Sequence, residues 1–177
     1  MTQERSFGAY AYRLRFRFFT GARWISGEVT TTQRRLLDFL NMDHPQPILA
    51  EEASVQTQRD VVAGPTPTGD ALVNAAAVIF AEPLEDSQEP LPPGDPLLLV
   101  RKTPERAKLV LGPYEITGDV YVAEGAGVFG ALLGGRKRFV PVGKAVVRRI
   151  DEPCFLEEYP ILFVNKDRIE YFSPAST

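Results

Sequence analysis

The same five-residue pattern occurs twice in this chain of 177 residues. ISGEV (25–29) and ITGDV (116–120) each read isoleucine, a small hydroxyl residue, glycine, an acid and valine. Gly21 falls on Gly112 at the same offset of 91 residues. Self-similarity at a fixed offset is the sequence signature of repeated modules, and it restricts the fold more strongly than any local motif.

The similarity extends to the end of each repeat. VNAAAVIFAEP (73–83) matches VNKDRIEYFSP (164–174) at the first two positions and at the final proline. We therefore expect two homologous modules, at residues 1–83 and 104–177. A Pro-rich, acidic segment at 84–103 is typical of an extended linker.

Two details of this alignment bear on structure. Between the matched ends, ASV (53–55) meets AVV (145–147) only after a shift of one residue. Within the linker, LLLVRK (97–102) is open to two interpretations, a strand of the second module or a clamp between modules.

Bulk properties indicate a globular protein. The net charge is −3 and 44% of the residues are hydrophobic, so disorder of the whole chain is not expected. A single cysteine fits a reducing cytoplasm. The first residues lack the apolar region of a signal peptide, and no apolar run approaches the ~20 residues of a membrane helix. We expect a cytoplasmic protein without a membrane segment.

Each module begins with strand signals. YRLRFRFFT (12–20) alternates arginines with apolar residues, which is the period of a half-buried strand. TGAR turns this strand into a second one, and the second module repeats the hairpin. Glycines inside strands mark bulges or bends. Gly27 and Gly118 are therefore expected where each second strand bends.

A short apolar segment follows each hairpin. RRLLDFLN (34–41) and GVFGALLGG (127–135) have helical spacing over about two turns. Asn41 aligns with Gly134, and both residue types tolerate the left-handed conformation after a helix. The alignment predicts a shared left-handed cap at these two positions.

Further strands complete each module. A third strand is expected at 47–58 and 138–150, a loop at 59–70 and 151–159, and two closely linked strands at 71–75 and 77–82 and at 161–165 and 168–172. Five short, bent strands with one helical turn predict an all-β fold of two tandem SH3-like or Sm-like small β-barrels.

Two stretches resemble known proteins. ILFVNKDRIEYFSP (161–174) is similar to the last two strands of bacterial Sm-like proteins, in which a Lys-containing turn joins them. The hairpin and the LLDFLN segment (36–41) resemble a family of uncharacterised bacterial small β-domain proteins, present here in tandem. The Sm-like resemblance implies that Lys166 lies in an RNA-facing turn with Arg168 close by.

A basic cluster precedes the third strand of the second module. Arg136, Lys137 and Arg138 are followed by Phe139, which could stack on a base while the cations contact phosphates. The favoured interpretation is a solvated loop, or a partner for the acids at 151–158.

Other motifs give no catalytic constellation. GAGVFG (125–130) has the glycine spacing of a dinucleotide fingerprint, but Gly134 cuts the following helix short. His44 is the only histidine, and acids surround Cys154. We expect no cofactor, no metal and no enzymatic activity.

These observations favour a non-catalytic interaction or assembly module, with a protein partner or self-association. The alternative is an RNA-binding Sm-like protein that uses the basic second module. A small-ligand sensor with its site between the barrels is a third class.

Overall fold

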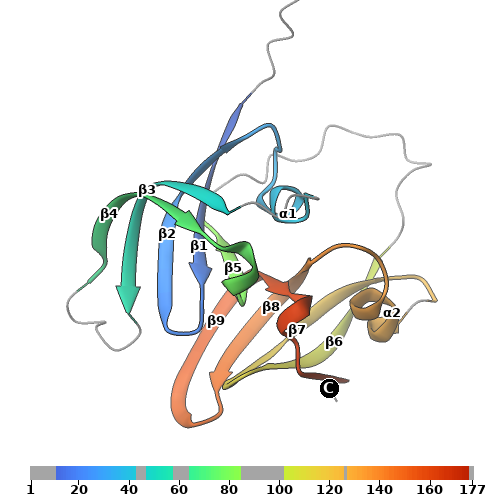
Figure 1. The fold of residues 1–177 in the computed structure, drawn as a ribbon. Coiled ribbons are helices and arrows are strands. Elements are labelled where there is room, and N and C mark those ends of the chain that lie inside the picture. The colour runs from blue at the N-terminus through green and yellow to red at the C-terminus, as the bar shows by residue number, and fades with distance from the viewer. Residues whose placement is uncertain (1–10, 43–46, 58–63, 85–101, 126, 176–177) are drawn as a thin grey trace, which may run out of the picture.

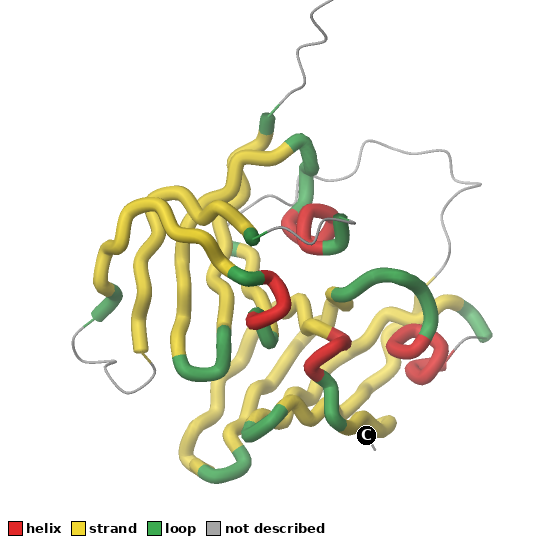
Figure 2. Tube along the Cα trace, in the orientation of Figure 1, coloured by secondary structure: helices red, strands yellow, loops and turns green. Residues whose placement is uncertain are grey.

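The computed structural model describes residues 11–42, 47–57, 64–84, 102–125 and 127–175, with the backbone alone at 153–155. The first half contains β1 (Tyr12–Phe19), β2 (Arg23–Thr31), α1 (Leu36–Leu40), β3 (Ile48–Thr57), β4 (Thr66–Val73), the 3-10 turn η1 (Ala75–Ala77) and β5 (Phe80–Pro83). The second half contains β6 (Lys102–Leu111), β7 (Tyr114–Ala123), α2 (Gly127–Leu133), β8 (Phe139–Arg149), β9 (Glu152–Asn165), the 3-10 turn η3 (Lys166–Arg168) and β10 (Tyr171–Pro174). The expected all-β class with short helical segments is confirmed (Figures 1 and 2).

The ten strands form one open antiparallel sheet, in the order β10-β6-β7-β8-β9-β5-β1-β2-β3-β4. Both halves have the same internal order, because β5-β1-β2-β3-β4 corresponds to β10-β6-β7-β8-β9. Closure of either half on its own would require its two outer strands to pair. Instead, β9 of the second half pairs with β5 of the first, so two separate barrels are not confirmed.

The alternation in the first strand has the expected result. The apolar side of β1 is fully buried and consists of Leu14, Phe16 and Phe18. The arginines between them meet carboxylates, with Arg13 Nε 3.0 Å from Glu28 Oε2 and Arg17 Nε 2.8 Å from Glu82 Oε2. The first of these pairs is half exposed and the second is partly buried. Surface ion pairs contribute only about 0–1 kcal/mol, so burial of the apolar side is the larger contribution to the stability of the strand.

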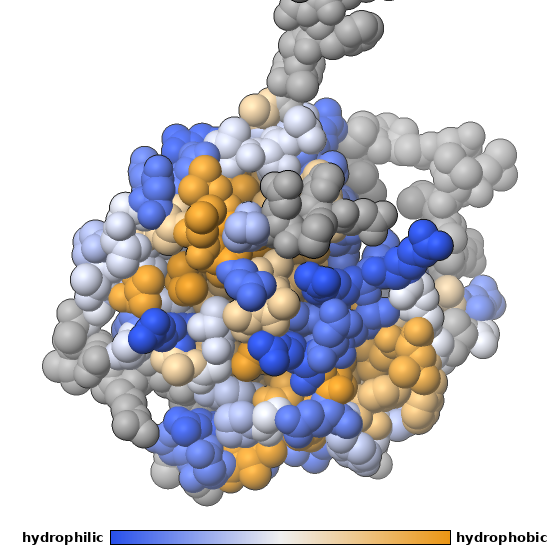
Figure 3. Space-filling view, in the orientation of Figure 1, coloured by the Kyte–Doolittle hydropathy of each residue, from blue (hydrophilic) through white to orange (hydrophobic). Residues whose placement is uncertain are grey.

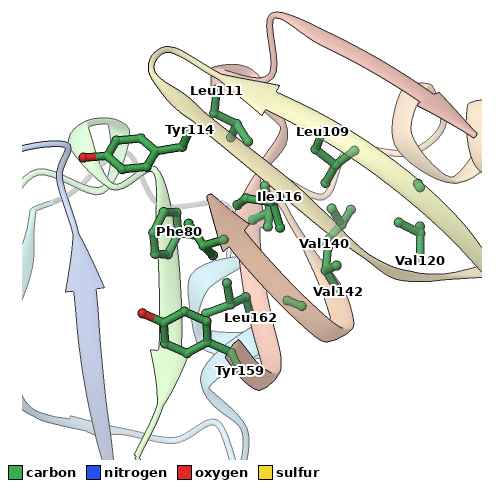
Figure 4. Close-up of a cluster of buried hydrophobic side chains, with 14 of the residues drawn as sticks. Phe80, Leu109, Leu111, Tyr114, Ile116, Val120, Val140, Val142, Tyr159 and Leu162 are labelled. Atoms are coloured by element: carbon green, nitrogen blue, oxygen red, sulfur yellow. The ribbon is translucent and has the colours of Figure 1, made fainter. Parts of the chain in front are cut away.

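The core is shared between the halves. One buried cluster lies mainly in the second half but includes Phe19, Trp24 and Phe80 of the first. The other lies mainly in the first half but includes Phe139 and Phe163 of the second. Figure 4 shows Phe80 among the core side chains of the second half. Neither half therefore completes its core from its own residues.

Gly27 and Gly118, where bends are expected, both lie at register shifts of the sheet. The register between β2 and β3 shifts at Gly27, and the register between β7 and β8 shifts at Gly118. A Cβ atom at Gly118 would lie 2.9 Å from the carbonyl oxygen of Gly143, and one at Gly27 would lie 3.0 Å from that of Glu51. Close approach of the facing strand, and not a left-handed backbone, is what requires glycine here.

The left-handed residues of these bends are on the facing strands. Glu52 in β3 has φ 51° and Lys144 in β8 has φ 46°. They are related by the offset that the one-residue shift in the alignment predicts. A left-handed conformation is uncommon for residues other than glycine, so its recurrence at matched positions means that both halves bend in the same way.

Two expected loops are wrong in part. Residues 66–70 belong to β4 and residues 152–159 to β9. Pro67 and Gly69 misled the prediction, because such residues are accepted in a strand at the edge of a sheet. Lys102 begins β6, while 97–101 and most of the linker lie outside the described residues.

Replacing Gly118 with valine is expected to lower the free energy of unfolding by about 1–3 kcal/mol, as overpacking does. The added side chain would collide with Val142 and the backbone of β8. Thr117→Val is the matched control, because Thr117 is a half-buried neighbour in the same strand. Chemical denaturation measures both variants, and equal stability of the two would contradict this account of the bend.

Candidate interaction site

A seam between β5 and β9 joins the two halves of the sheet. Phe80 pairs with Val164 and Ala81 with Phe163. The amide of Asn165 donates to the carbonyl oxygen of Ile79 over 2.9 Å. Phe80 of β5 is 1% exposed and Phe163 of β9 is 7% exposed. The four-residue strand β5 therefore makes strongly apolar contacts in the seam.

A buried amide closes one end of the seam. Asn165 is fully buried, and its Nδ2 donates to the carbonyl oxygen of Val78 over 2.8 Å. Its Oδ1 accepts from the backbone amide of Asp167, at the start of η3. Both ends of the side-chain amide are thus satisfied, as burial of a polar group requires.

A second asparagine connects the halves beside α1. Asn41 Nδ2 donates to the carbonyl oxygen of Phe139 over 2.9 Å, and the amide of Phe139 donates to Asn41 Oδ1 over 2.8 Å. The side chain of Asn41 therefore bonds the first residue of β8 as a neighbouring strand would.

The predicted left-handed cap at Asn41 and Gly134 is wrong. Asn41 has φ −98°, and the left-handed residue after α2 is Gly135. Asn41 is needed for its side-chain amide, which the alignment with a glycine could not indicate. Position 134 requires glycine because a Cβ atom there would collide with the carbonyl oxygen of Gly130.

Aromatic rings of the two halves also pack against each other across the seam. Phe19 meets Tyr114 edge-on at 4.9 Å, and Trp24 lies 6.4 Å from Tyr159. The Tyr114 hydroxyl donates to the carbonyl oxygen of Gly21 over 3.1 Å. Burial, together with the hydrogen bond to Glu157, raises the pKa of the Tyr159 phenol. This phenol therefore stays neutral at physiological pH.

The basic cluster divides into exposed and structural residues. Arg136 and Lys137 are exposed in the loop between α2 and β8. Arg138 is partly exposed and pairs with Asp167 at 3.1 Å. Phe139 is fully buried, so its ring is not accessible for the stacking that the alternative interpretation requires. Its place as the first residue of β8 fixes the ring in the core.

Lys166 and Arg168 lie near this loop in η3. Lys166 Nζ donates to the carbonyl oxygens of Gly134 and Gly135 at 3.0 and 3.3 Å. Arg168 Nε donates to the carbonyl oxygen of Ala76 in η1 over 3.0 Å. The fold thus gathers the two predicted groups of cations but uses these two as donors to backbone, one of them across the seam.

The glycines of the fingerprint motif lie at and within the short helix α2, where one backbone amide is already bonded to a carboxylate. The helix α2 has seven residues, and the amide of Val128 donates to the carboxylate of Glu105. Within the described ranges, no group of three metal-binding side chains occurs and no helix is long and apolar enough to span a bilayer.

A hollow of about 240 Å³ lies between α1, β2 and β3. Its walls include Phe39, Ile48 and Leu49, and Arg138 reaches it from the second half. The polar groups of the hollow already have partners, since Thr30 bonds Glu51 at 3.2 Å and Arg138 pairs with Asp167. These contacts do not single out a ligand.

The two outer strands of the sheet carry exposed apolar residues that the sequence analysis missed. Leu72 in β4 is 70% exposed and Tyr171 in β10 is 57% exposed. The repeat offset places Leu72 on Phe163 and Tyr171 on Phe80, which are both buried in the seam. Figure 3 shows an apolar patch over the β3–β4 part of the surface and another over α2. The alignment of the two halves indicates that these residues matter, but only when the pairing of β5 with β9 is known.

Asn165→Ala is expected to destabilise the protein by about 1–3 kcal/mol more than Asn74→Ala does. Both asparagines cap a 3-10 turn, but only Asn165 also bonds across the seam while buried. Urea unfolding of the two variants measures the difference. An equal loss in both would show that the seam bond contributes nothing beyond the cap.

We expect no salt-sensitive binding of single-stranded RNA at micromolar concentration, since Phe139 is buried and Arg138 is paired. Fluorescence anisotropy over a salt series measures this. Binding that weakens in the Arg136, Lys137 and Arg138 to alanine variant, with a smaller salt slope, would contradict the expectation. The matched control changes Arg13, Arg15 and Arg17 to alanine.

The comparison with known proteins leaves these contacts as the basis for function. No family model, curated protein or solved structure matches this chain.

Proposed function

We propose that the chain is a non-catalytic interaction or assembly module, built from two copies of an SH3-like or Sm-like β-module that share one sheet. The equal strand order, the matched bends at Gly27 and Gly118 and the left-handed Glu52 and Lys144 support the tandem origin. The single cysteine favours a cytoplasmic setting.

The outer strands carry this proposal. An edge strand presents unpaired backbone groups to any strand that can align with it, and proteins ordinarily protect such edges with charges or proline. β4 carries Pro67 and Asp70, and β10 carries Pro174. Leu72 at the C-terminal end of β4 and Tyr171 at the N-terminal end of β10 are nevertheless exposed apolar residues. Apolar side chains beside backbone that has no partner strand within the described part of the chain are suited to strand addition.

RNA binding by the second half is the alternative. Arg136 and Lys137 are exposed and available to phosphates. Two cations give weaker support than the two edges, because the ring beside them, Phe139, is buried and stacking contributes much of single-strand affinity.

A photo-crosslinking amino acid at Leu72 or Tyr171 tests the interaction function in cells that express the protein natively. Adducts of defined mass are expected from both positions. The control position is Leu133, which is 73% exposed but lies in the helix α2 and not in an edge strand. Adduct yields at both edge positions no greater than at Leu133 would overturn the proposal.

A further inference from the structure

We propose that copies of this chain associate head to tail, with β10 of one copy adding alongside β4 of the next in the register of the β5–β9 seam. This inference rests on the proposed interaction function and names the partner as a second copy. The chain already makes such a contact within itself, between β5 and β9.

The two outer strands of the sheet correspond to the two strands that pair in the seam. In the common strand order, β4 corresponds to β9 and β10 corresponds to β5. Since β9 and β5 pair within the chain, the same pairing between copies would join β4 to β10. The register follows from the seam, with Val73 opposite Tyr171 and Leu72 opposite Phe172.

Exposure at the corresponding positions supports this register. Phe163 is 7% exposed in the seam, whereas Leu72 at its counterpart is 70% exposed. Phe80 is 1% exposed, whereas its counterpart Tyr171 is 57% exposed. Each of the two outer strands thus carries a large apolar side chain, and a neighbouring strand would bury it as in the seam.

The polar contact of the seam also has a counterpart. Asn74 is exposed, and its Oδ1 caps η1 over 2.9 Å as Asn165 caps η3 over 3.1 Å. In the seam the other end of the Asn165 amide reaches the carbonyl oxygen of Val78. In the assembly, the Asn74 amide would reach that of Ile169 in the next copy.

The contact between copies would be weaker than the seam. Trp24, which packs in the seam cluster, has Glu115 at the corresponding position, and Arg168 has Ala77. Fewer aromatic contacts and one hydrogen bond fewer give a reversible association that depends on protein concentration.

The symmetry of this contact is head-to-tail. The two contacting surfaces differ, because each copy binds one neighbour through β4 and another through β10. Such contacts produce closed rings or open filaments. Pairing of two identical edges would instead stop at a dimer. Variants that block one edge each distinguish these arrangements.

The test uses Leu72→Lys and Tyr171→Lys in the full chain, with mass measured by analytical ultracentrifugation over a dilution series. Lysine on an edge opposes strand addition, and both positions are exposed, so the fold is preserved. Wild-type protein is expected to exceed the 19.6 kDa chain mass at high concentration. Each variant alone is expected to be monomeric, while their mixture forms a dimer through the two unblocked edges.

Leu133→Lys is the matched control and is expected to associate as the wild type does. A variant with a lowered melting temperature is replaced by the glutamine substitution at the same position. Monomeric wild-type protein at all concentrations, a mixture that stays monomeric, or a single variant that still dimerises would each overturn the head-to-tail assembly. Edge adducts to a different protein, with a monomeric purified chain, would overturn this inference while leaving the proposed interaction function intact.

Discussion

The pairing of β9 with β5 is the contact on which the rest of the structure depends. It turns two five-stranded halves into one sheet and places Phe80 and Phe163 in cores formed mainly by the other half. A core residue lost from such a site costs several kcal/mol, comparable with a large part of the stability of a small protein. The halves are therefore expected to depend on each other for their stability.

Residues that differ between the halves gather at this contact. Asn41, Trp24 and Arg168 all bond or pack across the seam, and their counterparts are Gly134, Glu115 and Ala77. The residues that bend the strands are instead alike, with glycine at both bends. The shared glycines shape each half, and these three divergent residues act together with the shared Asn165 in the contact between the halves.

Local patterns predicted most of the strands and the hairpin at the start of each half, but not the pairing of β5 with β9. The alternation in β1 and the glycines at 27 and 118 have direct physical consequences for one strand and its neighbour, so the sequence predicted them. The choice of β5 as the partner of β9 depends on which edges meet in space. Phe139 shows the same limit, because a ring beside three cations looked accessible and is buried by a strand that starts there.

Hydrogen exchange at the backbone amide of Asn165 tests the shared sheet most directly, since this amide donates to Ile79 across the seam. If the two halves form one cooperative unit, this amide exchanges only through global unfolding, as slowly as the amides between β8 and β9. Exchange at the rate of an exposed amide, with the β8–β9 amides still protected, would contradict the account and show two halves that separate in the native state.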